Sequence, residues 1–197
     1  MDREQLSALL YEALETEKGG VEVYRTALRC ALNPDLKEEW TKYLEQTQDH
    51  ERIMTELIQA VGLDPATETP GRTVVRHIGK SLVKAMEMAL NAAPPEAAEV
   101  VATECVVFAE TKDHLNWELI GEAAKQADGA TKKALKEAHD EVEDEEDEHL
   151  YHSTGWCREL HIQTLGLPAV LPPPEEEKHV KTAIGAARAK TARKEML

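Results

Sequence analysis

The sequence predicts an all-α protein built from long helices. Aromatic residues make up only 4% of the 197-residue chain, whereas alanine, leucine, glutamate and lysine, which favour helix over strand, are abundant. Apolar residues recur every three to four positions over long stretches, and proline or glycine stands where those stretches end. We therefore expect a bundle of helices that meet along their apolar faces.

The first two predicted helices form a hairpin. Residues 5–32 read as one helix, which stops at Asn33-Pro34 because proline cannot continue it. Residues 36–61 read as the second helix, and Gly62 ends it. Since the connection is short, the two helices should be antiparallel neighbours. Gly19-Gly20 interrupts the first helix, where we expect close packing or a local bulge.

A long crossover then leads to a second hairpin. Residues 62–95 form the crossover and contain an amphipathic helix of their own at 72–91. Residues 96–126 read as the third long helix, and Ala127-Asp128-Gly129 turns the chain into the fourth, at 131–165. The predicted architecture is an up-down four-helix bundle with a long crossover that contains an extra helix.

The last part of the chain differs from the bundle in composition. We divide the chain into a helical bundle at 1–166 and a proline-rich spacer with a basic tail at 167–197. The tail has too few apolar residues to hold a lone helix in water, so we expect it to be dispensable for the bundle. We also expect it to dock on the acidic body of a neighbouring subunit, which predicts a homo-oligomer, most simply a dimer. Its basic residues are Lys181, Arg188, Lys190, Arg193 and Lys194.

Charge and composition exclude several classes of protein. A net charge of −15 argues against nucleic acid as a partner, even with a basic tail, because phosphate binding needs concentrated lysine and arginine. No apolar run is long enough to span a membrane, and the first residues lack the apolar stretch of a signal peptide, so we expect a cytoplasmic protein. Cys30, Cys105 and Cys157 are widely spaced, which predicts reduced core thiols.

One short pattern carries the functional hypothesis. Glu146 and His149 share an apolar stripe with Leu135 and Leu160, so they should point into the bundle. Burying such groups unpaired is costly, but a carboxylate and an imidazole one helical turn apart can bind the same metal ion. The same spacing recurs at Glu176 and His179, in the tail, where we expect no function.

Partners for this pair lie at matching positions on the other helices. Counted from the turn at Pro34, Glu17 and His50 are about equally distant, and Glu110 and Glu146 are equidistant from the turn at Asp128. Side chains at equal distances from a hairpin turn can meet across the bundle. The predicted metal ligands are therefore Glu17, His50, Glu110, Glu146 and His149, with Glu104 as a substitute for Glu110.

In topology and in the placement of these residues, positions 5–165 resemble the ferritin-like superfamily of carboxylate-bridged di-metal bundles. By this resemblance Glu17 and Glu110 fill the single-glutamate positions of the first and third helices, and Glu146 with His149 fills the Glu-x-x-His of the fourth. The second helix departs from the family, because Thr47 stands three residues before His50 where a carboxylate is expected. His114 and His152 are candidates for a compensating ligand.

The resemblance implies a cofactor of iron, with two ions, or manganese. Oxygen and nitrogen ligands without thiolate suit these metals better than copper. The implied function is a metal-binding protein with oxidase, iron-oxidising or peroxide-handling activity, and with oxygen or peroxide as reactant. The alternative is a ferritin-like bundle without metal that serves as a stress or interaction module, which Thr47 favours.

Overall fold

A computed structural model describes residues 1–92 and 94–197, and these residues form seven α-helices and no strand. The all-α prediction is confirmed, and the five long predicted helices are present with ends shifted by only a few residues. No described helix is long and apolar enough to cross a membrane. The helices are α1 (Arg3–Cys30), α2 (Pro34–Ala60), α3 (Pro70–Ala92), α4 (Pro95–Gln126), α5 (Gly129–Thr164), α6 (Pro174–Glu177) and α7 (Ala183–Ala192).

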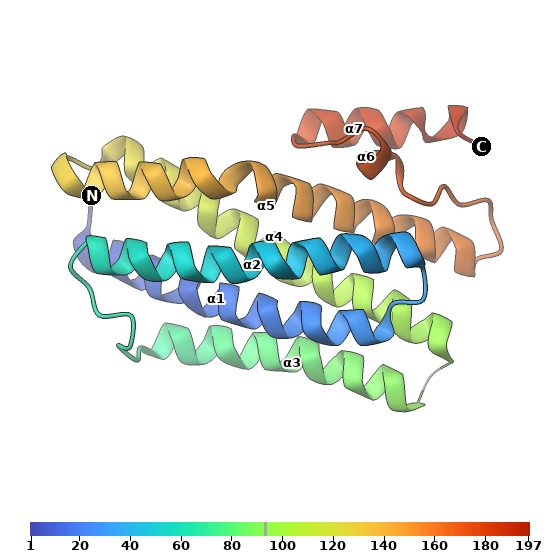
Figure 1. The fold of residues 1–197 in the computed structure, drawn as a ribbon, viewed down its shortest axis with the longest axis horizontal. Helices are drawn as coiled ribbons and strands as arrows, with labels where there is room; N and C mark the ends of the chain where they lie inside the picture. The colour runs from blue at the N-terminus through green and yellow to red at the C-terminus, as the bar shows by residue number, and fades with distance from the viewer. Residues whose placement is uncertain (93) are drawn as a thin grey trace.

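Four of the long helices pack in a closed ring (Figure 1). Helix α1 contacts α2 and α4, and α5 contacts the other side of both, so each helix has two neighbours in the ring. Helices α1 and α5 run in one direction and α2 and α4 in the other (Figure 1). Helix α3 crosses the length of the bundle outside the ring, against α1 and α4.

Local signals explain where the first hairpin turns. Asn33 accepts a hydrogen bond from the backbone N–H of Asp35 at 2.9 Å, and Pro34 occupies the first turn of α2, where its missing N–H costs nothing. The Glu99 carboxylate of α4 accepts from the backbone N–H groups of Leu32 and Asn33 at 2.6 and 2.7 Å. The turn is thereby fastened to the second hairpin.

The glycine pair in α1 allows two close approaches. A β-carbon added at Gly79 of α3 would lie 3.3 Å from the α-carbon of Gly19, so α1 and α3 nearly touch there. A β-carbon added at Gly20 would lie 3.1 Å from the methyl group of Thr47 in α2. Of the two expectations for this pair, close packing is confirmed, and α1 remains a continuous helix.

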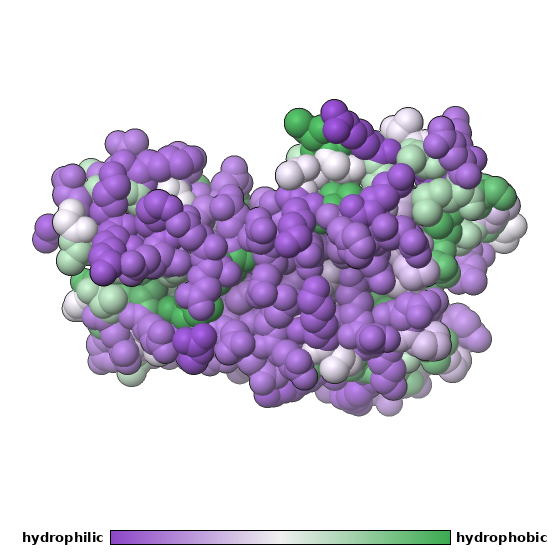
Figure 2. All heavy atoms as spheres, turned by 45° about the horizontal axis from the view of Figure 1, so that its top comes forward, coloured by the Kyte–Doolittle hydropathy of each residue, from purple (hydrophilic) through white to green (hydrophobic). Residues whose placement is uncertain are grey.

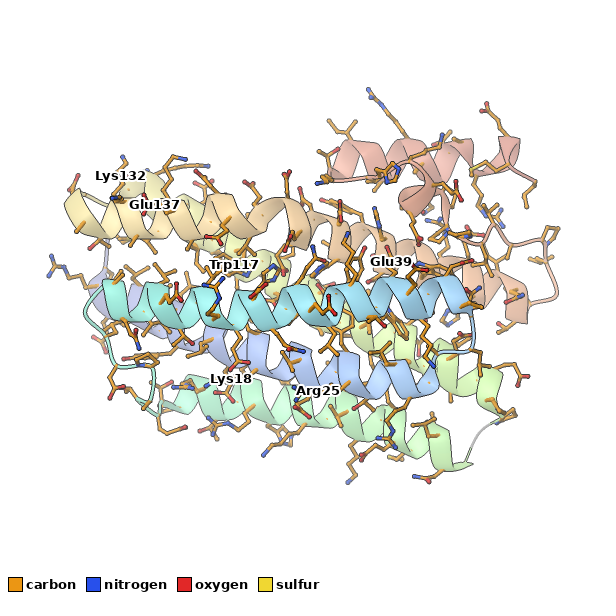
Figure 3. The ribbon with its side chains drawn as sticks, in the orientation of Figure 1. Lys18, Arg25, Glu39, Trp117, Lys132 and Glu137 are labelled. Atoms are coloured by element: carbon orange, nitrogen blue, oxygen red, sulfur yellow. The ribbon has the colours of Figure 1, made fainter. Side chains whose placement is uncertain are left out.

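The bundle core consists of two apolar clusters with a polar layer between them. One cluster gathers residues near the turn between α4 and α5, such as Leu10, Ile58 and Leu135, and the other gathers Trp40, Met86 and Leu160 at the opposite end. Figure 3 labels Trp117 and Glu39 among the helices, whereas Lys132 and Glu137 project from the outer side of α5. All three cysteines are free, as predicted.

The tail folds back onto α5 of its own chain, where its basic residues meet the kind of acidic surface that was expected on a neighbouring subunit. Arg193 pairs with the fully buried Glu159 at 2.7 Å, and Lys181 with Glu148 at 3.2 Å. The tail buries few of its large apolar side chains, since Ile184 is 66% exposed whereas Val180 is 5% exposed. Ion pairs and a few buried apolar residues, among them Pro173, Pro174 and Val180, hold this segment, which stands above the largely hydrophilic body in Figure 2.

A shared hydrogen-bond donor joins the tail to the core. The indole N–H of Trp156 lies 2.5 Å from a carboxylate oxygen of Glu39 in α2 and 2.6 Å from one of Glu176 in α6. Burial, and then the negative charge of Glu39, raise the pKa of Glu176 to about 8. Glu176 thus has a structural role that its sequence context did not indicate.

This carboxylate should make docking of the tail depend on pH. The pKa of Glu176 is higher in the docked tail than its ordinary 4.5, so its contribution to docking is complete below about pH 4.5 and is lost as the pH rises through about 8. We expect limited proteolysis of the tail to be faster at about pH 9 than at about pH 6. Glu176→Gln should remove most of this difference, whereas the exposed-site control Glu177→Gln should keep it. An equal pH response in both variants would contradict the assignment.

Candidate metal centre

The structure brings all five predicted ligands into the polar layer. Glu17 comes from α1, His50 from α2, Glu110 from α4, and Glu146 with His149 from α5, so every helix of the ring contributes. Each is buried, with no side chain exposed by more than a few per cent. Helical spacing turns each residue inward, and the matched distances from the two hairpin turns set them at one level.

The ligating atoms lie within a few ångströms of one another. His50 Nδ1 is 2.9 Å from Glu146 and 4.0 Å from Glu17. His149 Nδ1 is 3.5 Å from Glu110 and 3.6 Å from Glu146. Glu146 is therefore central to the group and lies between the two imidazoles.

A fourth carboxylate, Asp113, joins the cluster. One oxygen each from Glu17, Asp113 and Glu146 lie within 4.8 Å of one another, as do atoms of His50, Glu146 and His149. Asp113 was not predicted as a ligand, because His114 was expected on the inner face of this helix. The signal was present, since Asp113 is three residues after Glu110 and four before the buried Trp117.

Apart from the ion-pair contact of 2.9 Å between His50 Nδ1 and Glu146, the inward-facing atoms of this cluster have no hydrogen-bond partner among the described residues. A buried polar atom without a partner typically costs about 1–3 kcal/mol, so several at one point require an explanation. Four carboxylates and two imidazoles with free atoms directed at one place form a set of oxygen and nitrogen donors without sulfur. The unpaired atoms are Glu17 Oε2, His50 Nδ1, Glu110 Oε2, Asp113 Oδ1, both Glu146 oxygens and His149 Nδ1.

The opposite nitrogen of each imidazole is held by a second residue. His50 Nε2 is 2.9 Å from the Glu145 carboxylate, and His149 Nε2 is 3.1 Å from the Gln46 side-chain oxygen. Both contacts place a hydrogen-bond acceptor at Nε2, which favours a proton there and directs Nδ1 of each ring into the cluster. Similarly, the Trp117 indole donates to Glu17 at 2.7 Å and fixes that carboxylate.

The electrostatics of the cluster reflect crowded negative charge. Burial raises the pKa of Glu17 to about 8, and the charges of Glu146 and Glu110 add to the effect. Burial and the charge of Glu17 also raise the pKa of Asp113 well above its usual value. Burial lowers the pKa of His50, but its contacts with Glu145 and Glu146 outweigh this and raise it. The metal-free cluster therefore retains protons that a bound cation would displace.

Thr47 does not contribute a ligand, because its hydroxyl donates to the backbone carbonyl of Tyr43 at 2.8 Å. The substitute candidates also lie elsewhere. Glu104 is exposed and contacts His161, whereas His114 contacts Asp147 at 2.8 Å. His152 belongs to a neighbouring buried network, where its Nδ1 lies 2.8 Å from Glu39 and 3.0 Å from the Tyr43 hydroxyl. The additional ligand candidate in the cluster is therefore Asp113.

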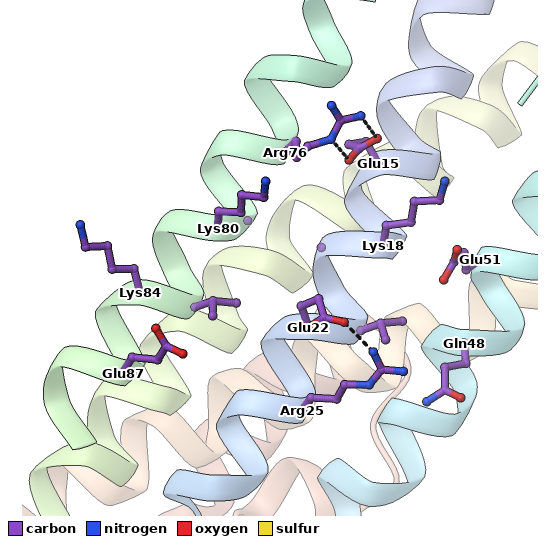
Figure 4. Close-up of a pocket in the computed structure, with 14 residues that line it drawn as sticks. Glu15, Lys18, Glu22, Arg25, Gln48, Glu51, Arg76, Lys80, Lys84 and Glu87 are labelled. Atoms are coloured by element: carbon purple, nitrogen blue, oxygen red, sulfur yellow. Dashed lines mark hydrogen bonds and ion pairs between the residues drawn. The ribbon is translucent and has the colours of Figure 1, made fainter. Parts of the chain in front are cut away.

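A large groove on the surface does not touch this cluster. A groove of about 980 Å³ runs between α1, α2 and α3, and none of the six cluster residues lines it. Figure 4 shows that its charges pair within the groove, Arg76 with Glu15 and Arg25 with Glu22. Lys18 and Lys80 also line it. It has the mixed charge of an ordinary polar surface, and the buried cluster is the stronger functional candidate.

No protein-family model, curated protein or solved structure matches this chain. The functional interpretation therefore depends on the geometry of the cluster.

Proposed function

We propose that this protein is a ferritin-like metal-binding protein whose buried cluster holds iron or manganese and supports oxidase, iron-oxidising or peroxide-handling chemistry. The cluster consists of Glu17, His50, Glu110, Asp113, Glu146 and His149. The observation that carries the proposal is the convergence of their unpaired buried atoms. The closed ring of four helices and the long crossover agree with the resemblance to that superfamily.

The donor set favours these metals. Carboxylate and imidazole ligands suit iron and manganese, and the three cysteines stand outside both groups of atoms that could hold an ion. Four carboxylates also give the site enough negative charge to neutralise two divalent cations. Bound iron or manganese would supply electron transfer to oxygen or peroxide, because both metals change oxidation state under mild conditions.

The residues of the chain prepare the site for such an ion. Glu145 and Gln46 orient the two imidazoles with Nδ1 inward, and Trp117 orients Glu17. The apolar clusters above and below the layer exclude bulk water, which strengthens every charge interaction inside. Protons held by Glu17 and Asp113 in the metal-free protein would leave as the cation enters.

A metal-free helical module is the alternative that Thr47 favours. A function without metal does not explain why the carboxylates are buried together, because buried carboxylates lower the stability of the fold unless a cation or hydrogen bonds offset that cost. A module without a metal would gain stability by replacing them with apolar side chains. The metal content of the purified protein distinguishes these two functions directly.

Binding should also be visible as thermal stabilisation. Free metal at about a thousand times its dissociation constant adds about 4 kcal/mol to the free energy of unfolding, which raises Tm by about 10 °C for a chain of this size. We expect this shift when chelator-treated protein receives ferrous iron or manganese, and metal analysis should then find one or two ions per chain. Oxygen and peroxide consumption by the loaded protein would identify the reaction. Unchanged Tm and no retained metal would favour the metal-free module.

A further inference from the structure

A crevice between α4 and α5 connects the surface to the buried cluster. It has a volume of about 230 Å³, and Glu146 and Trp117 form part of its lining. Glu146 is 1% exposed, and its carboxylate, with His50 Nδ1 at 2.9 Å as an ion-pair contact, lies at the inner end of the crevice. The larger groove of Figure 4, by contrast, reaches none of the cluster residues.

Ionisable groups line this crevice at graded depths. At the outside, the Glu143 side chain is 59% exposed, and Glu118 is exposed as well. Deeper in, the side chains of His114 and Asp147 are 23% and 20% exposed, and they lie 2.8 Å apart across the two helices. Deepest is Glu146, next to Asp147 on α5, whose side chain is 2% exposed. A cation moving inward would meet an oxygen or nitrogen donor at each level.

Packing contacts lie on the other sides of the cluster. Between α1 and α2, the Thr47 methyl lies against Gly20. Between α2 and α5, Gln46 and Glu145 contact the imidazoles, and Lys42 pairs with Glu148 at 2.8 Å. Helix α3 covers the outer side of the contact between α1 and α4. The α4–α5 crevice is thus the approach for which the structure offers both space and donors.

We propose that the α4–α5 crevice is the entry route for the divalent cation, and that His114 and Asp147 bind the ion transiently and pass it to Glu146. This inference rests on the proposed metal function. Water ligands lost by the ion would be replaced stepwise by the His114 imidazole and the Asp147 carboxylate, which lowers the cost of dehydration before burial. Acidic groups at the mouth would raise the local cation concentration and the association rate.

The tail forms one side of the mouth. Thr182 and Ala183, at the start of α7, line the crevice together with the residues of α4 and α5. Lys181 pins this part of the tail by pairing with Asp144 at 3.5 Å and with Glu148. A bulky residue at Ala183 should therefore narrow the mouth without altering any donor.

Rapid mixing of metal-free protein with cobalt(II) provides the test, because cobalt absorbs visible light when it enters an oxygen and nitrogen site. We expect His114→Ala and Asp147→Asn to slow loading on the order of tenfold, with the final number of ions per chain unchanged. Ala183→Trp should slow it as well. His161→Ala is the matched control, since His161 pairs with Glu104 across the same two helices at 3.2 Å but lies outside the crevice.

The outcomes separate the two proposals. Wild-type loading rates in both donor variants would overturn the entry route while leaving the metal site intact. Reduced final stoichiometry in His114→Ala would also overturn it, because His114 would then be a permanent ligand. Absence of cobalt, iron and manganese binding by the wild-type protein would overturn the proposed function, and the entry route with it.

Discussion

Replacing Glu146 and His149 together by alanine is expected to abolish metal binding and leave the helical fold intact. Glu146 belongs to both groups of potential ligands, and His149 supplies one of the two imidazoles, so the double variant removes the centre of the site. Metal analysis after loading should fall from one or two ions per chain to none. Circular dichroism should retain the helical signal of the wild-type protein.

The metal-free double variant should be about as stable as the metal-free wild type. Glu146 lies close to Glu17 and Asp113, and burial of several carboxylates together raises the pKa of both neighbours. Removing one of these carboxylates relieves repulsion, whereas the cavity left by alanine destabilises, and the two effects oppose each other. We expect Tm within a few degrees of the wild-type value. Full metal content in the double variant would refute the assignment.

Glu141→Ala is the control for this experiment. Glu141 lies on the same helix as Glu146 but is exposed to solvent. It removes the same charge without touching the polar layer, so metal content should be unchanged. Asp113→Asn tests whether Asp113 is a metal ligand. We expect this variant to bind the metal more weakly and to keep its fold.

Much of the fold could be predicted because its signals are local. Proline at Pro34 and Pro95 stands in the first turn of α2 and α4, and Gly62, with φ of +82°, follows the end of α2. Because each hairpin folds back at a short turn, two residues at the same distance from that turn lie side by side across the hairpin. For this reason counting from the turns placed Glu17, His50, Glu110 and Glu146 together.

The error at Asp113 came from the rotation of one helix. The stripe expected from the sequence contained Glu110, His114 and Trp117. The stripe that the structure buries shares Glu110 and Trp117 but has Asp113 in place of His114. The structure buries the stripe with alternating steps of four and three residues, which is the spacing typical of helices that pack nearly parallel. Only the packing of α4 against α1 and α5 decides between them. The buried stripe is Val106, Glu110, Asp113, Trp117, Ile120 and Ala124.

The tail could not be placed from sequence because its contacts are isolated ion pairs between distant positions. Glu159 is completely buried on α5, yet in the sequence it is one of many acidic residues. Arg158 is its neighbour on α5, and the folded tail brings Arg193 and the backbone N–H of Val170 within 2.9 Å of it. Pairing of this kind leaves no periodic signal, so the sequence predicted docking on an acidic surface but not that the surface is α5 of the same chain.

Arg158→Ala is expected to release the tail from the bundle. The Arg158 guanidinium donates two parallel hydrogen bonds of 2.7 Å to Glu175, whose side chain is only 3% exposed, and a third to Glu159. Breaking a buried pair by removing one partner typically costs about 3–5 kcal/mol, because the remaining charge stays buried and unpaired. The short tail has little apolar surface to resist that cost, so local detachment should precede unfolding of the bundle.

Limited proteolysis should show this release as rapid cleavage between α5 and α6, leaving a resistant fragment that contains α1 to α5. Arg188→Ala is the matched control, because Arg188 is exposed on α7 and removes the same charge from the same segment. Since the tail borders the α4–α5 crevice, Arg158→Ala should also speed cobalt loading, opposite to the effect of Ala183→Trp. Equal cleavage rates in the two arginine variants would show that the ion pairs do not hold the tail. Collapse of the whole chain would show instead that the tail is part of the core.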